Sequence, residues 1–204
     1  MAASFAGLAH AGNQLYEPLA ASVQAGLRSA IADKPAPRHA FTDGLSAANW
    51  LTEMSARLER RIPRFETRLE FLRTVHYEAI RAGLDPQLVL AIIQVESNFR
   101  KYAVSSAGAR GYMQVMPFWT GLIGQPGDNL FALRANLRYG CVILRHYLNR
   151  ENGDLFRALG RYNGSLGRPE YPTLVNSALR ASWQYDEKRG VARAMASPEV
   201  ANAK

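Results

Sequence analysis

Glu96 is the residue best placed to do chemistry in this 204-residue chain. It stands near the end of an apolar run, and helical spacing puts its side chain on the same side as those of Val89, Ile92 and Ile93. Burial among aliphatic side chains disfavours a charged carboxylate, and the negative end of a helix dipole acts in the same direction. We therefore expect the pKa of Glu96 to be raised, which suits a general acid.

Local signals define the helix that carries this glutamate. Asp85 suits the N-cap and Pro86 the first helical position. A glycine-punctuated loop follows and ends in Gly111-Tyr112-Met113-Gln114. Because a glutamate near a helix end is more often solvated or ion-paired, the sequence of this loop is what favours a catalytic interpretation of Glu96.

Three segments in a fixed order carry a family resemblance. The first runs from Glu96-Ser97-Asn98-Phe99 through Ala103 to Pro117, the second is Asn136-Leu137-Arg138-Tyr139-Gly140, and the third is Arg161-Tyr162-Asn163-Gly164. Together they resemble the signature of the soluble lytic transglycosylase (SLT) family of peptidoglycan-cleaving enzymes, over about residues 83 to 180. The resemblance implies a mainly α, lysozyme-like catalytic domain with its site in a long cleft.

The resemblance implies that one glutamate does the chemistry. As an acid it protonates the glycosidic oxygen between N-acetylmuramic acid and N-acetylglucosamine, and as a base it then activates the muramoyl 6-hydroxyl, which leaves a 1,6-anhydromuramoyl end. Many glycosidases instead pair two carboxyls. The nearest later acids, Asp128 and Glu170, have no distinctive catalytic setting, so Glu96 is the single predicted catalytic residue. No cofactor and no metal are implied.

The family pattern also assigns residues to the substrate. Ser105 corresponds to a serine near the N-acetyl or 6-hydroxyl group, Gln114 to an amide that lines the cleft, and Tyr162 to a tyrosine whose hydroxyl approaches the catalytic glutamate. Arg161 replaces the usual alanine and could pair with a peptide carboxylate. The predicted substrate-binding residues are Ser105, Met113, Gln114, Met116, Arg161, Tyr162 and Asn163.

Several of these residues have a purely structural alternative. Ser105 and Gln114 are of types that often serve local backbone geometry, and a tyrosine at an apolar helix position such as Tyr162 is often a core residue. At least one of Met113 and Met116 is expected in the core. Asn163 is expected to brace its loop.

The rest of the chain divides into an extension, a domain and a tail. Residues 1–45 read as an N-terminal extension with a short helix around residues 15–30, broken at Lys34-Pro35-Ala36-Pro37. Residues 46–185 are predicted to form the helical domain, and residues 186–204 a flexible tail. Within the domain, Ser46 suits the cap of a helix stopped by Pro63.

Further helices follow from the apolar spacing. The pattern predicts one from Phe65 to Gly83 with Phe65 on its apolar side, and a long one capped by Asp128 or Asn129 and reaching Gly153. Asp154 suits the cap of a shorter helix. A last helix is expected over residues 171–183, with Leu174 facing inward.

Composition narrows the partners. A net charge of +8 favours polyanionic surroundings, which include nucleic acid, envelope polymers and the carboxylates of peptidoglycan stem peptides. No reading helix or aromatic platform for nucleic acid is recognisable. Charge alone does not choose among the other polyanions, and the family resemblance implies peptidoglycan strands as the partner. The single cysteine, Cys141, is expected in the core. A mixed-sign pattern predicts a solvated, salt-bridged helix face containing Arg57, Arg60, Arg61, Arg64, Arg68 and Arg73 with Glu59, Glu66 and Glu70.

Three functions remain open at this point. The first is a lytic transglycosylase, the second a lysozyme-type hydrolase of the same bond, and the third a non-catalytic glycan-binding module. We expect an exported protein of the periplasm or cell envelope, with no integral membrane segment. The first residues lack a basic n-region, so the export signal is expected to have been removed from this sequence.

Overall fold

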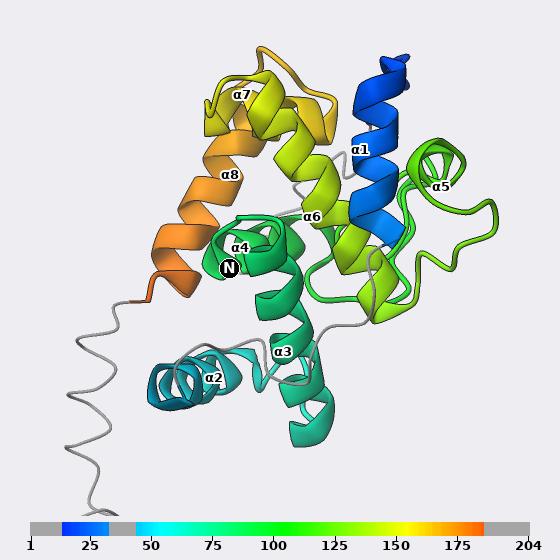
Figure 1. The fold of residues 1–204 in the computed structure, drawn as a ribbon. Helices are drawn as coiled ribbons and strands as arrows, with labels where there is room; N and C mark the ends of the chain where they lie inside the picture. Colours follow the sequence, from blue (N-terminus) through cyan, green and yellow to red (C-terminus); the bar gives the residue numbers. More distant parts are fainter. Residues whose placement is uncertain (1–13, 33–43, 186–204) are drawn as a thin grey trace, which may run out of the picture.

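The computed structural model describes residues 14–32 and 44–185, and the fold in these ranges is built from helices (Figure 1). Strand pairing there is limited to two isolated bridges, Val104 with Arg110 and Arg110 with Val115. The predicted mainly α fold is confirmed. The elements are α1 (Ala21–Ala32), α2 (Gly44–Leu58), α3 (Phe65–Arg81), α4 (Pro86–Ser97), α5 (Phe118–Ile123), α6 (Leu133–Arg150), α7 (Leu155–Asn163), α8 (Glu170–Ala178) and the π-helical turn η1 (Leu179–Trp183).

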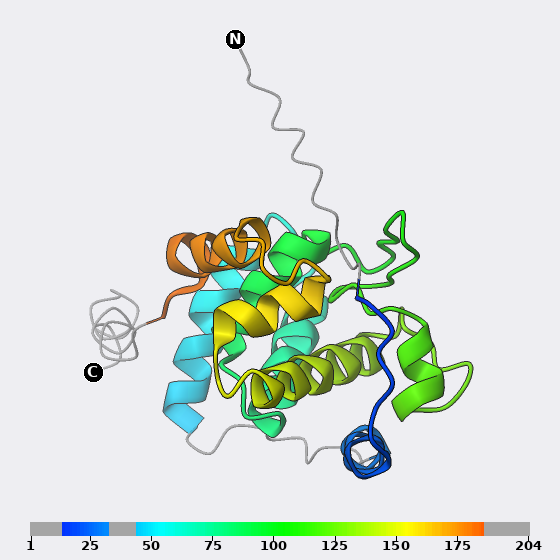
Figure 2. The ribbon, with the colours of Figure 1, turned by 90° about the horizontal axis from the view of Figure 1, so that it is seen from above.

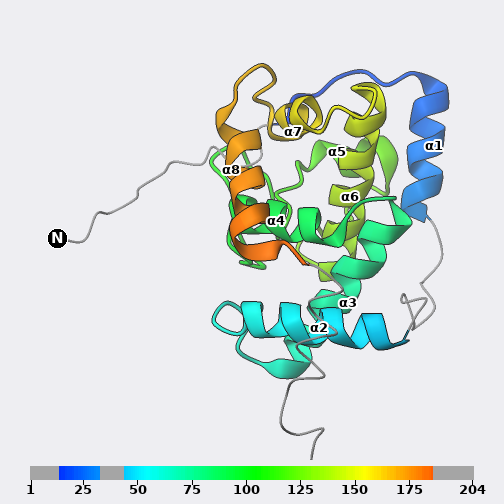
Figure 3. The same cartoon turned by 90° about the vertical axis from the view of Figure 1, so that its left-hand side faces the viewer.

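Two helices organise the core. α6 packs against α3, α7 and α1, and Figure 2 shows it lying between α1 and α7. α4 packs against α3, α8 and η1, while α2 packs on α3 at the end of the molecule away from α7 (Figure 3). Because α4 is covered from several directions, its aliphatic residues are almost all buried. Glu96 lies in the last turn of this covered helix.

The predicted signals for α4 are confirmed. The Asp85 side chain accepts a hydrogen bond of 2.8 Å from the backbone nitrogen of Gln87, and Pro86 is the first helical residue. At the other end Asn98 adopts the left-handed conformation with φ of 47°. The chain therefore leaves the helix within two residues of Glu96.

The predicted start of the long helix is wrong. α6 begins at Leu133, not at Asp128 or Asn129, and it ends at Arg150 before reaching Gly153. Both candidate caps form hydrogen bonds elsewhere. The Asp128 side chain accepts from the Tyr139 hydroxyl and from the backbone nitrogen of Gln125. The Asn129 side chain accepts from the backbone nitrogen of Phe131 at 2.9 Å, before α6 begins. The Asp154 cap is confirmed, with its side chain 3.0 Å from the Arg157 nitrogen.

Other local predictions also need correction. α2 begins at Gly44 within the described residues, so Ser46 lies inside it, and α2 ends at Leu58 rather than at Pro63. Phe65 and Leu174 are 54 % and 50 % exposed. On α8 the inward position belongs to Val175, one residue further along. The side chains of Trp50, Met54, Leu58 and Ile62 are buried, and so is that of Cys141, as predicted.

Arg68 does not belong to a solvated helix face. Its side chain is buried and donates to Ser55 Oγ at 2.7 Å, to the Ile62 carbonyl at 2.7 Å and to the Pro63 carbonyl at 3.0 Å. Carbonyls at a helix end need such donors when water is excluded. Arg68 thus fixes the connection between α2 and α3, and the prediction for this arginine is wrong.

A buried carboxylate joins the extension to the domain. The Glu78 side chain is buried and forms ion pairs with Arg81 at 3.2 Å and with Arg138 at 3.0 Å. The same two arginines donate to the carbonyls of Ala30 and Ile31 at the end of α1. Charge compensation at Glu78 therefore orients the donors that hold the last turn of α1.

The predicted extension helix appears as α1, which begins at residue 21. The predicted break at residues 34–37 and the tail at 186–204 lie outside the described residues, and the domain boundaries stay predictions. No helix in the described part of the chain is both long and apolar enough to cross a lipid bilayer.

Candidate active site

Glu96 sits in the last turn of α4 and is 4 % exposed. The hydroxyl of Tyr171, from α8, donates a hydrogen bond of 2.6 Å to its Oε1 atom. The two residues are held by direct packing of α8 on α4. A buried carboxyl therefore meets a neutral donor at the end of the helix where the sequence predicted a catalytic group.

Tyr171 remains a donor over the whole physiological pH range. Burial raises its pKa well above the ordinary value of 10.0, and the charge of Glu96 raises it further. A tyrosinate beside a carboxylate would place two buried negative charges in contact, which is unfavourable. The hydroxyl therefore keeps its proton and fixes one oxygen of Glu96.

Tyr171 is the site residue that the sequence analysis missed. It follows the third family segment by several residues and stands in a short stretch with the proline Pro172 beside it. The only available signal was its place at the start of a predicted helix, and that spacing does not say which face meets α4. The pairing is a tertiary contact between residues 75 positions apart.

Tyr162 forms its hydrogen bond with the loop that follows α4. Its hydroxyl donates to the carbonyl oxygen of Met113 at 2.7 Å, and its side chain is fully buried. Burial raises the pKa of Tyr162 well above 10.0, with the charge of Glu96 as the next cause. Tyr162 is thus close enough for the charge of Glu96 to affect its pKa, but its hydroxyl proton is used in the hydrogen bond to the loop that follows α4.

Gln114 also acts on this loop. Its side chain is 1 % exposed, and Nε2 donates to the carbonyls of Ala103 at 3.1 Å and Gly111 at 2.9 Å. The residue itself has a φ of 49°, in the left-handed region. The predicted cleft-lining amide is therefore a loop brace in this structure, and its nitrogen is committed to backbone oxygens.

The second family segment organises the same loop from α6. Asn136 is buried, accepts from the Met113 nitrogen at 2.8 Å and donates to the carbonyls of Arg110 and Leu130, each at 2.8 Å. One turn later, Gly140 lets the loop approach, because a Cβ there would lie 2.4 Å from the Met113 sulfur. The Asn-x-x-x-Gly spacing thus matches one helical turn facing the loop.

Ser105 lies at the half-exposed edge of the loop. Its Oγ accepts a hydrogen bond of 3.1 Å from the backbone nitrogen of Ala109, and its own carbonyl accepts from Gly108 at 2.9 Å. The hydroxyl proton is not used in these bonds. Ser105 therefore shapes its turn and keeps a donor for another oxygen.

The remaining predicted residues divide between core and surface. Met113 is fully buried, Met116 is half-buried at the edge of the core, and Asn163 is buried at the end of α7. Arg161 forms ion pairs with Glu151 and, at 3.3 Å, with Glu17 of the extension. Because its guanidinium already holds two carboxylates, the predicted pairing of Arg161 with a peptide carboxylate is not supported.

Metal ligands do not gather near this site. Across residues 14–32 and 44–185, no three side chains of His, Cys, Asp or Glu are grouped so that they could hold a metal ion. The chemistry available from the described side chains is proton transfer at Glu96 and hydrogen bonding around it.

Residues 73–172 match the family model described as "Transglycosylase SLT domain". The chain belongs to this SLT family. The matched range begins inside α3 and ends at Pro172, so it contains Glu96, Tyr171 and all three segments noted in the sequence. It leaves α1 and α2 outside.

Relatives of known name agree with this membership. The chain is 33 % identical over 114 residues to "Membrane-bound lytic murein transglycosylase C" of Photorhabdus laumondii, an alignment that covers 48 % of this chain and 32 % of that protein. A protein of the same name from Yersinia pestis is 34 % identical over 114 residues, with the same coverage. The "Transglycosylase" of Enterobacteria phage PRD1 is 31 % identical over 109 residues, covering 53 % of this chain and 40 % of its own. The chain thus spans about a third to two fifths of these relatives' length.

Proposed function

We propose that this chain is a lytic transglycosylase that cleaves the β-1,4 bond between N-acetylmuramic acid and N-acetylglucosamine in peptidoglycan. The observation that carries the proposal is the buried Glu96 carboxyl with the Tyr171 hydroxyl on its Oε1, inside an SLT domain. The names of the relatives support murein as the polymer.

Glu96 acts first as the acid. Because Tyr171 donates to Oε1, that oxygen is an acceptor and the transferable proton belongs on Oε2. The proton passes to the glycosidic oxygen as its bond to the muramoyl C1 breaks, and the oxygen of the substrate's N-acetyl group bonds to C1 in its place. Glu96 is left as a carboxylate.

The same residue then acts as the base. The carboxylate takes the proton of the muramoyl 6-hydroxyl while that oxygen attacks C1 and displaces the N-acetyl oxygen. The products are a new N-acetylglucosamine 4-hydroxyl and a 1,6-anhydromuramoyl end, and Glu96 regains its proton. Tyr171 keeps its own proton throughout and holds the carboxyl in one orientation.

Product analysis separates this function from hydrolysis. A lysozyme-type hydrolase would use Glu96 in the same first step and water in the second, so its reducing ends differ from anhydro ends by one water. We expect mass spectrometry of purified sacculi after digestion to show anhydromuropeptides as the main product. A majority of reducing muramic ends would favour the hydrolase.

Substitution at Glu96 separates both enzymes from a non-catalytic glycan-binding module. Glu96→Gln keeps the shape of the side chain and loses the transferable proton, so turnover should fall by about a hundredfold or more. Glu66→Gln, at an exposed position in the first turn of α3, is the matched control and should retain activity. Activity within a few-fold of wild type in Glu96→Gln would overturn the assignment of the acid.

We place this activity in the periplasm or cell envelope, where the polymer is found. Fractionation of cells that express the gene from its native locus tests this location. Recovery of the protein in the cytoplasmic fraction alone would contradict it.

A further inference from the structure

A cavity of about 450 Å³ lies between the end of α2 and η1. Figure 3 shows these two elements facing each other, with η1 at the end of α8 and α2 beyond it. Among the described residues, arginine is the only charged type in its lining. The lining residues are Arg57, Arg61, Arg180, Ala181, Ser182, Trp183 and Gln184.

Arg57 is the structural member of this set. Its Nε and one terminal nitrogen donate to Glu53 Oε1 at 3.1 Å and 2.9 Å, so its charge is compensated. The other terminal nitrogen donates to the carbonyls of Ser182 and Gln184, each at 3.0 Å. Arg57 therefore attaches η1 to α2 and forms one wall of the cavity.

Arg61 and Arg180 are not compensated in this way. Arg61 donates through Nε to Asn98 Oδ1 at 3.0 Å, and its guanidinium lies 5.5 Å from the centre of the Phe99 ring. These contacts fix the group, and its two terminal nitrogens form no hydrogen bond within the described residues. Arg180 is exposed and forms no ion pair there. Two guanidinium groups thus share a cavity in which no described lining residue carries a carboxylate.

The cavity is connected to α4 on both sides of Glu96. Asn98, the partner of Arg61, is the left-handed residue that ends α4. Trp183, another lining residue, donates from Nε1 to Gln94 Oε1 at 2.8 Å. The two contacts flank Glu96 by two residues in each direction, so a ligand in the cavity is held by side chains that also hold the end of the catalytic helix.

We propose that this cavity binds a carboxylate of the stem peptide carried by the glycan strand, held between Arg61 and Arg180. The forked guanidinium donors match a planar carboxylate, and charge-assisted bonds of this kind are stronger than neutral ones. The volume lies within the range of pockets that hold small ligands, so it has room for one end of a stem peptide. The inference rests on the proposed function, because it takes the wall polymer as the ligand.

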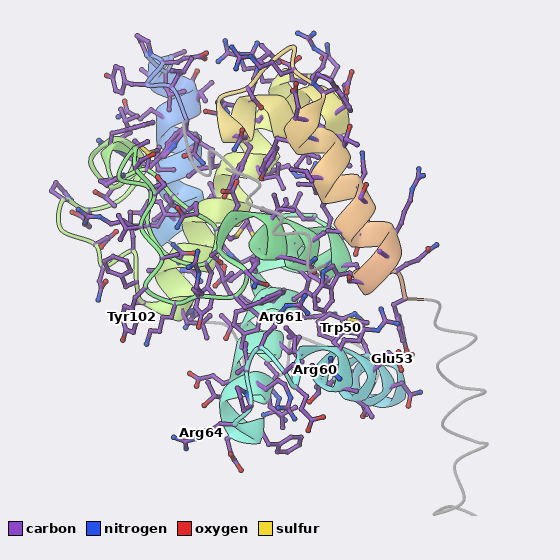
Figure 4. The ribbon with its side chains drawn as sticks, turned by 180° about the vertical axis from the view of Figure 1, so that it is seen from behind. Trp50, Glu53, Arg60, Arg61, Arg64 and Tyr102 are labelled. Carbon is purple, nitrogen blue, oxygen red and sulfur yellow. The ribbon has the colours of Figure 1, made fainter. Side chains whose placement is uncertain are left out.

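The matched pair Arg180→Glu and Arg64→Glu tests the proposal. Both variants change the net charge equally, but Arg64 does not line the cavity, and Figure 4 shows it on the α2–α3 turn at the end away from α4. Binding is measured with each change placed in Glu96→Gln protein, so that the strands are not cleaved. The probes are peptide-bearing glycan strands and the same strands stripped of peptides by an amidase.

We expect Arg180→Glu to weaken binding of peptide-bearing strands about tenfold or more, the scale of one charge-assisted hydrogen bond, and to leave binding of stripped strands nearly unchanged. Arg64→Glu should affect both probes equally and weakly. Arg180→Lys should recover part of the loss, because it restores the charge without the fork. Equal losses in Arg180→Glu and Arg64→Glu would show general charge attraction and overturn the proposal.

Two further measurements distinguish a peptide site from a general oxyanion site, and a failure of this inference from a failure of the proposed activity. If inorganic phosphate at millimolar concentration displaces peptide-bearing strands as well as free stem peptides do, and Arg180→Glu abolishes this competition, the cavity is a general oxyanion site and the peptide assignment is wrong. Titration of the wild-type protein with stem peptides alone, followed by NMR, tests the cavity without any cleavage. Cleavage of sacculi without peptide binding would sink only this inference, whereas peptide binding without cleavage would sink only the proposed activity.

Discussion

The Tyr171 hydroxyl and the Glu96 carboxyl meet at 2.6 Å, and both side chains are buried. The bond joins α8 to the last turn of α4 across 75 residues of sequence. Since burial and the charge of Glu96 raise the pKa of Tyr171 well above 10.0, the hydroxyl keeps its proton and donates across the physiological pH range. The orientation of the catalytic group therefore depends on how α8 packs against α4.

Tyr171→Phe removes this bond and little else. We expect turnover to fall about tenfold, in the range of one lost hydrogen bond to a charged group, while the fold is retained. A donated hydrogen bond favours the ionised carboxylate, so the limb of the pH–activity profile that reports Glu96 should move to higher pH. Steady-state rates across a pH series measure both effects.

The control for this substitution is Tyr102→Phe. Tyr102 is 71 % exposed on the loop after α4, and Figure 4 shows it on the opposite side of the molecule from α8. The Tyr102→Phe substitution also removes a tyrosine hydroxyl, but one that is not bonded to Glu96. If Tyr171→Phe and Tyr102→Phe have indistinguishable profiles, the Tyr171 bond has no part in catalysis.

Sequence reasoning located Glu96 because the signals around it are local. Asp85, Pro86 and an aliphatic run are sufficient to define α4 and its direction. Tyr171 and Arg68 were missed or misplaced because their partners come from other helices, and the spacing within one helix cannot show which residue of a distant helix it meets. Similarly, the start of α6 was misjudged because Asp128 bonds to Tyr139, a tertiary partner, instead of capping the helix.

Residue types in the loop were predicted better than their roles. The family pattern placed Gln114 and Tyr162 at the site, but their hydrogen bonds go to backbone carbonyls of the loop itself. A motif records that a residue type is needed at a position. It does not state whether the residue contacts substrate or holds the backbone that does, and only the three-dimensional partners decide this.

Gly111 and Gly108 form a matched pair for the loop. Both have positive φ, 76° and 88°, so alanine at either position costs about 1 kcal/mol of backbone strain. A Cβ at Gly111 would also lie 2.5 Å from Asn136 Nδ2 and from the Leu130 carbonyl oxygen, whereas one at Gly108 meets nothing within 4 Å.

We therefore expect Gly111→Ala to lower the free energy of unfolding by clearly more than Gly108→Ala, and to reduce activity because Asn136 also holds Met113. Urea denaturation with matched activity assays measures the difference. Equal effects of the two substitutions would show that the close approach at Gly111 is relieved without cost.

His76 predicts a loss of stability at mildly acidic pH. Burial lowers its pKa from 6.5 to about 4, and its ring packs edge-on against Trp50 at 5.2 Å between centres. The unfolded chain therefore binds a proton more readily than the folded chain between these values. The contribution of neutral His76 to the free energy of unfolding is complete above pH 6.5 and should be lost as the pH falls toward about 4.

His76→Phe keeps an aromatic ring against Trp50 and removes the titrating group. The free energy of unfolding of this variant should change less between pH 7 and pH 4 than that of the wild type, as measured by denaturation at each pH. An identical pH dependence in both proteins would assign the acid sensitivity to other groups.

Ser105→Ala tests how the intermediate is resolved. The Ser105 hydroxyl accepts from the Ala109 nitrogen and keeps its proton for another oxygen, and the family resemblance pairs this position with the substrate's N-acetyl or 6-hydroxyl group. A 6-hydroxyl held in place attacks C1 within the same molecule, an entropic advantage that diffusing water lacks unless the site also orients it. We therefore expect Ser105→Ala to reduce turnover and to raise the hydrolysed fraction of the products.

Ser106→Ala is the matched control, because Ser106 is exposed and adjacent in the same loop. A loosened turn alone would slow both variants' reactions without changing the ratio of anhydro to reducing ends. A changed ratio in Ser105→Ala alone therefore identifies loss of substrate positioning. A disordered loop would slow glycosidic cleavage, but it would not by itself favour water over the 6-hydroxyl. If the ratio stays at the wild-type value while turnover falls, Ser105 supports the loop and the orientation of the 6-hydroxyl must come from another group.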